Sequence, residues 1–254
     1  EAVWEGDIER VEMLLAAGVD INITDADSST ALIVATRIDN TACLQLLLEA
    51  KADVDAVDED GNTASIVAAN YGHTECLQLL LDAKADIHAS NNKGFTALTV
   101  AACNGQTGSL QFLLDAKADI NTASEDGCTA TILATLNGHA GCLQSLLLTK
   151  ADIGAVNKEG CTALMLAANE GHTECSQLLL DANANINTAS KYGNTALTLA
   201  AMRDNAECLQ LLLEARAEIE AADTNGLTGL ILAAMYGHST SLQLLLDAKA
   251  SIDA

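Results

Sequence analysis

Eight cysteines are the residues of this 254-residue chain with the most chemical potential, as disulfide partners, metal ligands or reactive thiols. Zinc sites and redox-active thiol pairs are typically built from cysteines two residues apart, and the sequence has no such pair and no histidine–cysteine cluster. Five of the cysteines instead share one register, with Ser109 and Ser241 in the same position: Cys43, Cys76, Cys142, Cys175 and Cys208. We therefore interpret these five as small buried core residues, and we expect no metal and no cofactor.

The other three cysteines, Cys103, Cys128 and Cys161, lie outside that register. We expect them to be partly exposed, and a redox-sensing role is an alternative hypothesis for them, although no nearby group clearly lowers a thiol pKa. The sequence has no phosphate-binding glycine loop, no metal-binding histidine pair and no nucleophile with an evident base, so we predict no catalytic residues and no enzyme activity.

The elements that position these residues repeat with a fixed period. Threonines recur every 33 residues, at Thr30, Thr63, Thr96, Thr129, Thr162, Thr195 and Thr228. A constant period of this length indicates stacked supersecondary units, each of which contacts only its neighbours. Cysteines in equivalent positions of adjacent units would lie about 10 Å apart, beyond the reach of about 7 Å between Cα atoms that a disulfide allows. This use of cysteine indicates an intracellular, reducing compartment, most simply the cytoplasm, with the nucleus or an organelle matrix left open.

Residues 58–90 illustrate one unit. Gly61 suits a turn with positive φ, and Thr63 can cap a short helix that ends at Gly72 in the left-handed conformation. A second helix opens at His73, where a polar residue able to cap recurs in most units. Its apolar residues, Cys76, Leu77 and Leu79–Leu81, cover a face wide enough to be buried between neighbours on both sides.

The unit resembles the ankyrin repeat, most clearly in Gly160-Cys161-Thr162-Ala163-Leu164-Met165-Leu166-Ala167-Ala168-Asn169-Glu170-Gly171-His172 and on to Ile186-Asn187. The resemblance implies an all-α, ankyrin-repeat α-solenoid, in which helix-turn-helix units are joined by β-hairpin turns. We expect one array over residues 1–254, made of a partial repeat and seven further units: 1–24, 25–57, 58–90, 91–123, 124–156, 157–189, 190–222 and 223–254.

Three positions depart from the family pattern. The chain has no proline, the histidine of the first helix is replaced by Ile, Thr or Met, and the glycine after the second helix is kept only at Gly18. Later repeats carry Lys51, Lys84, Lys117, Lys150, Asn183, Arg216 and Lys249 there. A left-handed backbone at these positions would cost on the order of 1 kcal/mol each. We interpret the cations as a solvated edge neutralised by nearby acids, with a cation ladder for an acidic partner as the alternative.

The ends of the sequence resemble internal repeat segments. Glu1 aligns inside a first helix, Asp253-Ala254 falls near a repeat boundary, and the leucines of the last helix show no polar outer face. We expect either a longer array or ends that another chain covers.

The formal net charge of −23 excludes nucleic acid as a favoured partner and is compatible with a basic protein partner or a larger assembly. No stretch of about 18 apolar residues occurs, so we predict no membrane-spanning segment.

Binding residues are expected where the repeats differ. The resemblance places such positions at the hairpin tips and at the end of the first helix of each unit, facing the concave side. Five of the six aromatic residues occupy them, and the sixth, Phe112, is assigned to the core. The predicted protein-binding residues are Trp4, Arg37, Ile38, Asn70, Tyr71, Phe95, Cys103, Leu136, Tyr192, Met202, Arg203, Leu227, Met235 and Tyr236.

The pattern therefore favours a non-catalytic protein–protein interaction scaffold or adaptor, which binds through the concave face and the hairpin tips. The alternative is a structural stapling subunit or segment of a large multiprotein complex.

Overall fold

The computed structural model describes residues 2–251, so the expectations for Glu1 and for Asp253-Ala254 lie outside the described residues. The chain divides into two compact units, Glu1–Glu125 and Asp126–Ala254. The first holds α1 (Ile8–Ala16), α2 (Ala31–Arg37), α3 (Thr41–Glu49), α4 (Ala64–Tyr71), α5 (Thr74–Asp82), α6 (Ala97–Cys103) and α7 (Thr107–Asp115). The second holds α8 (Ala130–Leu136), α9 (Ala140–Leu148), α10 (Ala163–Glu170), α11 (Thr173–Asp181), α12 (Ala196–Arg203), α13 (Ala206–Glu214), α14 (Gly229–Tyr236) and α15 (Ser239–Asp247).

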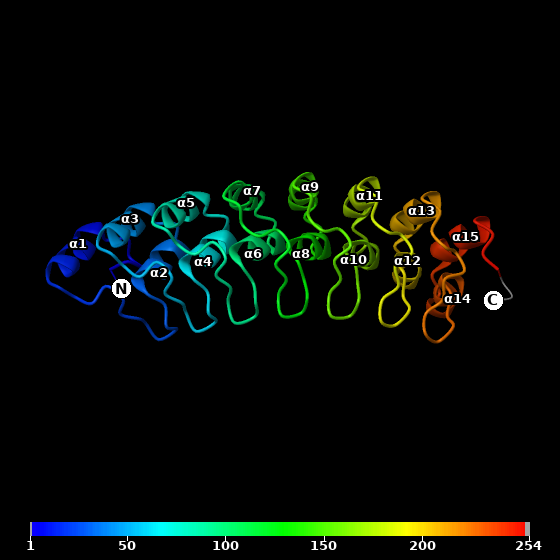
Figure 1. Cartoon of the computed structure of the whole chain (residues 1–254). Helices are drawn as coiled ribbons and strands as arrows, with labels where there is room; N and C mark the ends of the chain where they lie inside the picture. The colour runs from blue at the N-terminus through cyan, green and yellow to red at the C-terminus, as the bar shows by residue number, and fades with distance from the viewer. Residues whose placement is uncertain (1, 252–254) are drawn as a thin grey trace. The chain divides into compact units, whose positions relative to one another are not determined.

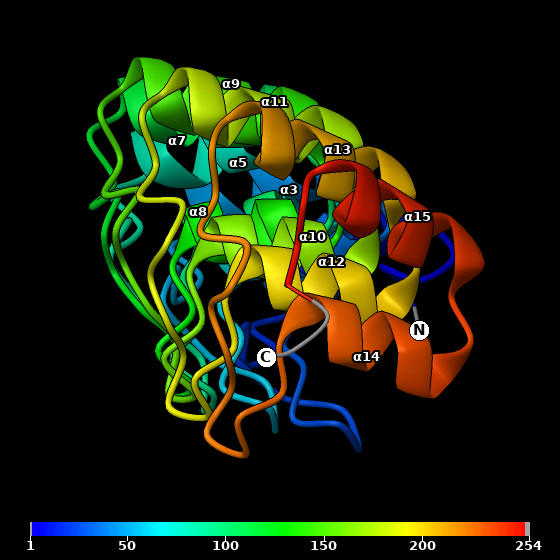
Figure 2. The ribbon, with the colours of Figure 1, turned by 90° about the vertical axis from the view of Figure 1, so that its right-hand side faces the viewer.

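Each unit is built from two helical layers and a row of hairpin loops (Figure 1). Within each unit the first helices of the repeats form one layer: α2, α4 and α6 in the first unit, and α8, α10, α12 and α14 in the second. The second helices form the other layer, and the hairpins extend away from the helices (Figure 2). The all-α ankyrin-type solenoid predicted from the sequence is confirmed within each unit.

The threonine of each repeat caps the first helix, as predicted. The Thr63 hydroxyl accepts a hydrogen bond from the backbone N–H of Ile66 at 3.3 Å, and the equivalent bond occurs in the other repeats. In α6 the hydroxyl of Thr99 also accepts from the backbone N–H of Thr96 at 2.8 Å, which completes a capping box. A threonine in the family's histidine position therefore adds a hydrogen bond within its own turn.

The backbone is left-handed where the period predicts it. Gly72 ends α4 with φ 78°, and Asp204 takes the same role after α12 with φ 57°. After the second helices, Gly18 has φ 75° and Lys84 has φ 72°, so the lysine adopts the conformation that a glycine would accept without strain.

The second helices provide the buried layer, but less of each helix is buried than the sequence predicts. Cys76, Leu77 and Leu80 of α5 are fully buried, whereas Leu79 and Leu81 keep intermediate exposure. Phe112, in the position equivalent to Leu79, is also partly exposed, so its assignment to the core is wrong. Successive residues point about 100° apart on a helix, and these positions fall on the flank of the packed stripe.

Hairpin loops are fixed by a polar residue at the start of each repeat. The Asp58 carboxylate accepts the backbone N–H groups of Asp60 and Asn62 at 3.1 and 2.8 Å, and the arms meet at a single bridge between Val57 and Thr63. Neighbouring hairpins are joined by one backbone hydrogen bond, such as that from Asn92 N–H to the Asp60 carbonyl at 3.0 Å. Each hairpin tip is thus held at a fixed position beside the next.

Candidate functional site

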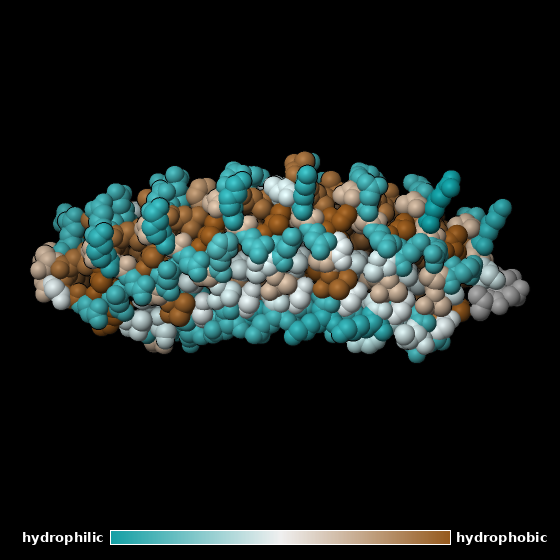
Figure 3. Space-filling model, viewed as in Figure 1, coloured by the Kyte–Doolittle hydropathy of each residue, from teal (hydrophilic) through white to brown (hydrophobic). Residues whose placement is uncertain are grey.

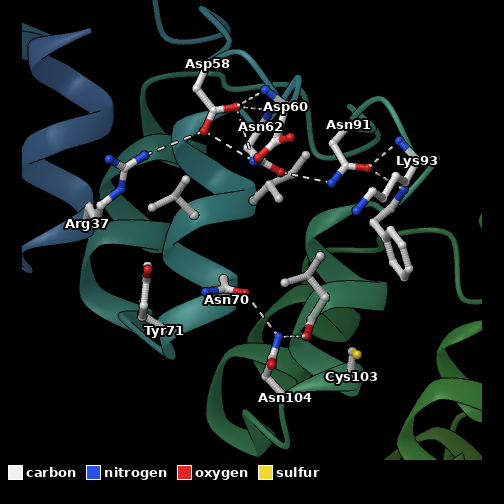
Figure 4. A pocket seen from close by; sticks show the side chains of 14 residues that line it. Arg37, Asp58, Asp60, Asn62, Asn70, Tyr71, Asn91, Lys93, Cys103 and Asn104 are labelled. Carbon is white, nitrogen blue, oxygen red and sulfur yellow. Dashed lines mark hydrogen bonds and ion pairs between the residues drawn. The ribbon is translucent and has the colours of Figure 1, made fainter. Parts of the chain in front are cut away.

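A cavity of about 540 Å³ lies in the first unit, between the hairpins and the first-helix layer (Figure 4). Three successive repeats contribute to it. Its lining residues from the hairpins are Asp58, Asp60, Asn62, Asn91, Lys93 and Phe95, and those from α2, α4, α6 and their ends are Arg37, Ile66, Val67, Asn70, Tyr71, Val100, Cys103 and Asn104.

A chain of hydrogen bonds forms the hairpin side of the cavity. Arg37 Nη2 lies 3.6 Å from Asp58 Oδ2, and the Asn62 amide donates to both Asp58 carboxylate oxygens at 3.2 Å. Asn91 Nδ2 in turn donates to Asn62 Oδ1 at 2.9 Å. The Asn91 oxygen accepts the backbone N–H groups of Lys93 and Phe95 at 3.0 Å, which fixes the next hairpin tip. This wall is held in place before any partner binds.

The helix-end side of the cavity is set by amide contacts between α4 and the repeat that follows. Asn104 Nδ2 donates to Asn70 Oδ1 at 3.1 Å, and Gln106 Nε2 donates to the Asn70 carbonyl at 3.3 Å. The Tyr71 ring is 51% exposed and stacks on His73 with centroids 5.7 Å apart. An ordered, exposed ring at the rim of an open cavity is a suitable anchor for a protein partner.

Five of the fourteen predicted binding residues line this one cavity: Arg37, Asn70, Tyr71, Phe95 and Cys103. The sequence prediction missed Asp58, Asp60, Asn62, Asn91, Lys93, Asn104, Ile66, Val67 and Val100. Asp58 and Asn91 were detectable, because an oxygen-bearing side chain recurs at this register and fixes the hairpin. No feature of the sequence marks Val67 and Val100 as binding residues, because the residue at their position is apolar in every repeat.

The second unit has its own cavity, which resembles that of the first unit in having a tyrosine and an arginine in its lining. Met202, Arg203, Tyr236 and His238 surround a cavity of about 390 Å³. Tyr236 stacks on His238 with centroids 5.9 Å apart, as Tyr71 does on His73 in the first unit. Three further predicted residues are therefore grouped here, at the ends of the first helices α12 and α14.

Trp4 lines a third cavity, of about 240 Å³, with Val3, Ile23 and Val34. The remaining predicted residues line none of these three cavities: Ile38, Leu136, Tyr192, Leu227 and Met235. Tyr192 lies at a hairpin tip, where a hydrogen bond to Glu159 raises the pKa of its phenol. Met235 is highly exposed, and Ile38, Leu136 and Leu227 are partly buried.

Histidines at the start of the second helices do not cap their own helices, in contrast to the prediction. His73, His172 and His238 occupy the N-cap position without a side-chain cap hydrogen bond. The His172 ring nitrogen instead lies 3.1 Å from the Leu136 carbonyl, and the His238 ring nitrogen 3.1 Å from that of Ala201. The imidazole reaches past its own first turn and binds an orphan carbonyl at the end of the preceding repeat's first helix.

The cysteines of the shared register are buried, as predicted. Burial and a hydrogen bond to Asp39 raise the pKa of Cys76 to about 12, and burial raises that of Cys175 to about 11. Cys161 is only partly buried, yet burial and nearby Glu159 raise its pKa also. A raised pKa keeps a thiol protonated and unreactive, which weighs against Cys161 as a redox sensor.

Within residues 2–251, no group of three or more His, Cys, Asp or Glu side chains is arranged to hold a metal ion. Over the same residues, every helix is too short or too polar to cross a bilayer.

Comparison with protein families identifies the repeat. A family model described as "Ankyrin repeats (3 copies)" matches residues 1–91, 40–124, 66–155, 98–191, 132–223 and 183–254, segments that overlap and together cover the chain. No curated protein matches the sequence. The match agrees with the threonine-capped first helices, the left-handed helix ends and the linked hairpins, and the chain therefore belongs to the ankyrin-repeat family.

Proposed function

We propose that this chain is a scaffold or adaptor that binds a protein partner through the hairpin tips and first-helix ends of its first unit. Ankyrin repeats are generally protein–protein interaction modules and are typically non-catalytic. The net charge of −23 makes a protein a better partner than a nucleic acid, because a field of that sign repels phosphates.

One observation carries the proposal. Five of the predicted binding residues line one open cavity, although they come from three different repeats: Arg37, Asn70, Tyr71, Phe95 and Cys103. Each occupies a position at which the repeats differ. Residues that are the same in all repeats form and pack the helices. Side chains at positions that differ between repeats are not needed for this, so those that line one cavity can recognise a partner.

The proposal also includes a reducing, intracellular location. Its support is that cysteines such as Cys76 and Cys175 serve as buried core residues with raised pKa values rather than as paired crosslinks.

The test is quantitative affinity capture from the source cells with the full chain, comparing wild type with a Tyr71→Ser/Phe95→Ser variant. Loss of two aromatic anchors should lower recovery of the specific partner about tenfold or more, since one such anchor contributes about 1–2 kcal/mol. The matched control is Leu148→Ser/Val156→Ser, which removes two exposed side chains outside the cavity. Unchanged recovery with the cavity variant, in a protein that melts as wild type does, would contradict the proposal.

A second candidate function is a stapling subunit within a larger complex. Three large apolar side chains away from the cavity favour it, Met13, Ile23 and Leu148, with exposed fractions of 72%, 64% and 79%. This function predicts that the isolated chain self-associates as its concentration rises, whereas an adaptor stays monomeric. Sedimentation velocity distinguishes the two, and recovery lost with the Leu148 control would also favour the stapling subunit.

A further inference from the structure

We propose that the cavity of the second unit is a further binding site, which takes one acidic side chain of a protein segment. Arg203 pairs with the carboxylate, and Met202 and Tyr236 contact the methylene groups of the same side chain. The site is separate from that of the proposed function, which lies in the first unit.

Arg203 is placed and oriented for such a contact. It is exposed at the end of α12 and lines the cavity of about 390 Å³. Its Nε donates to Asn169 Oδ1 at 3.3 Å, which helps to orient the guanidinium. Within residues 2–251, the two terminal nitrogens of that group take part in no hydrogen bond or ion pair. Both remain available for the two parallel hydrogen bonds that a guanidinium forms with a carboxylate.

The acidic residues next to this network are engaged by other groups. Glu170 Oε1 accepts from Asn169 Nδ2 at 2.6 Å, and Asp204 Oδ1 accepts from Ser241 Oγ at 2.7 Å. Neither carboxylate forms an ion pair with Arg203 in the described part of the chain. A carboxylate from a partner can therefore pair with Arg203 without displacing an existing contact.

The charge of the cavity lining favours an acidic partner over a basic one. Met202, Arg203, Tyr236 and His238 line the cavity, and none of them is acidic, so a cationic side chain would meet Arg203 without a counter-ion. In the first unit, by contrast, the arginine of the cavity already lies 3.6 Å from an aspartate.

The net charge of −23 limits the ligand to a single negative charge. It opposes the approach of any anion at long range, but salt screens charges beyond about 8 Å at physiological ionic strength, so the close contact with Arg203 decides. A phosphate would carry more charge into the same field and be repelled more strongly than a carboxylate. On the face shown in Figure 3, hydrophilic side chains border the second unit along its hairpins and its second helices, so polar contacts predominate there.

The rest of the cavity is ordered and partly apolar. A ring nitrogen of His238 lies 3.1 Å from the Ala201 carbonyl, and Tyr236 stacks on this ring with centroids 5.9 Å apart. Met202 is partly buried beside them in the lining. The methylene groups of a glutamate can lie against the thioether and the tyrosine ring while its carboxylate reaches Arg203.

The experiment uses two pentapeptides with blocked ends, Leu-Ala-Glu-Ala-Leu and Leu-Ala-Gln-Ala-Leu. Blocked ends leave the glutamate as the only carboxylate, and its central place presents the same side chain whichever way the peptide lies. Binding to the full chain is measured by NMR titration at low salt. The glutamate peptide should bind about threefold or more tighter than the glutamine peptide, and added salt should reduce the difference.

Three variants assign the preference to the cavity. Arg203→Gln should lower the affinity for the glutamate peptide to that for the glutamine peptide. Arg216→Gln is the matched control, because it removes the same charge from an exposed residue of the second unit outside the cavity, and it should leave the preference unchanged. Glu170→Gln should increase the preference, since it removes a negative charge that shares Asn169 with Arg203.

Equal binding of the two peptides by wild type would overturn the inference, as would a preference that survives Arg203→Gln or is lost equally in Arg216→Gln. Thermal melting shows that each variant is folded. None of these measurements involves Tyr71 or Phe95, so the proposed function is tested separately by partner capture.

Discussion

At the residue scale, equivalent positions of the repeats keep the same structural role while the residue type varies. Asp58, Asn91 and Asp223 start their repeats, and the oxygen of each accepts two backbone N–H groups of its hairpin. Ser65 and Thr131 stand where other repeats have leucine, and their buried hydroxyls have no hydrogen-bond partner among residues 2–251. Substitution of a residue that differs from its counterparts in the other repeats can therefore measure the contribution of a single interaction.

The buried thiols should be inert in the native protein. At neutral pH a pKa of about 12 for Cys76 and about 11 for Cys175 leaves almost no thiolate, and burial excludes the reagent. We expect the five cysteines of the shared register to react with a thiol reagent only after unfolding. Mass-spectrometric mapping of labelled residues before and after adding denaturant checks this, and rapid native labelling of Cys76 would refute it.

Asp223 should make stability depend on pH. The backbone N–H of Leu227, together with that of Asn225, lowers the pKa of the carboxyl. Its stabilisation is therefore complete above the unfolded-state pKa of about 3.9 and is lost as pH falls through the lowered folded-state value. Asp223→Ala should lower the melting temperature at neutral pH and have less effect in strong acid. Asp223→Asn should stay close to wild type at neutral pH, because Asn91 and Asn157 serve the same position.

Thr131→Val should stabilise the protein by about 1 kcal/mol. The substitution keeps the shape of the side chain and removes a buried hydroxyl that has no partner. Thr36→Val is the matched control, because the Thr36 hydroxyl donates to the Leu32 carbonyl at 2.9 Å and its loss should not stabilise. Urea denaturation measures both variants. A less stable Thr131→Val protein would show that the hydroxyl has a partner in solution.

At the element scale, the second helix of a repeat is stable because it packs against its neighbours on both sides. Helices of nine residues are too short to persist alone in water, so packing supplies their stability. Leu80 of α5 lies between α3 and α7 and is fully buried. Its counterpart Leu14, on α1, is 42% exposed, and the main helix that α1 packs on is α3.

Leu80→Ala should therefore cost about 2–5 kcal/mol of unfolding free energy, and Leu14→Ala less than about 1.5 kcal/mol. The two substitutions delete the same atoms at the same register, so the difference reports the additional packing of α5, against α4 as well as against α7. Urea denaturation of both variants provides the measurement. Equal losses would mean that the packing of α5 is no denser than that of α1.

At the scale of the whole molecule, charge is the dominant feature. A net charge of −23 and a sequence pI near 4.2 imply mutual repulsion among acids spread over the whole chain. Repulsion of this kind keeps a leucine-rich array soluble at neutral pH and opposes its compact state.

Added salt should raise the melting temperature by a few degrees, because ions screen this repulsion more strongly in the compact protein than in the expanded chain. Solubility should be lowest near the pI. Calorimetry across a range of NaCl concentrations, with turbidity measured against pH, tests both effects. A melting temperature that falls with salt would show that attractive pairs such as Arg37–Asp58 outweigh the repulsion.

The period of 33 residues was sufficient to predict most of the local structure. Thr63 as a cap, Gly72 in the left-handed region and Cys76 in the core follow from short-range geometry, and all three predictions are confirmed. The sequence did not predict the role of His172, because its partner carbonyl belongs to another repeat. The prediction from sequence also overestimated how much of α5 is buried, because the extent of burial depends on how closely the neighbouring helices approach.

The sequence by itself determined the repeat, the family and the positions free to vary, because these depend on local hydrogen bonds and on periodic burial. Only the tertiary structure decided which variable residues act together. Arg37, Tyr71 and Phe95 line one cavity while Tyr192 and Leu227 do not, although all five occupy positions that differ between repeats. The physical reason is that this cavity depends on side chains from three repeats whose separation is set by packing within the first unit.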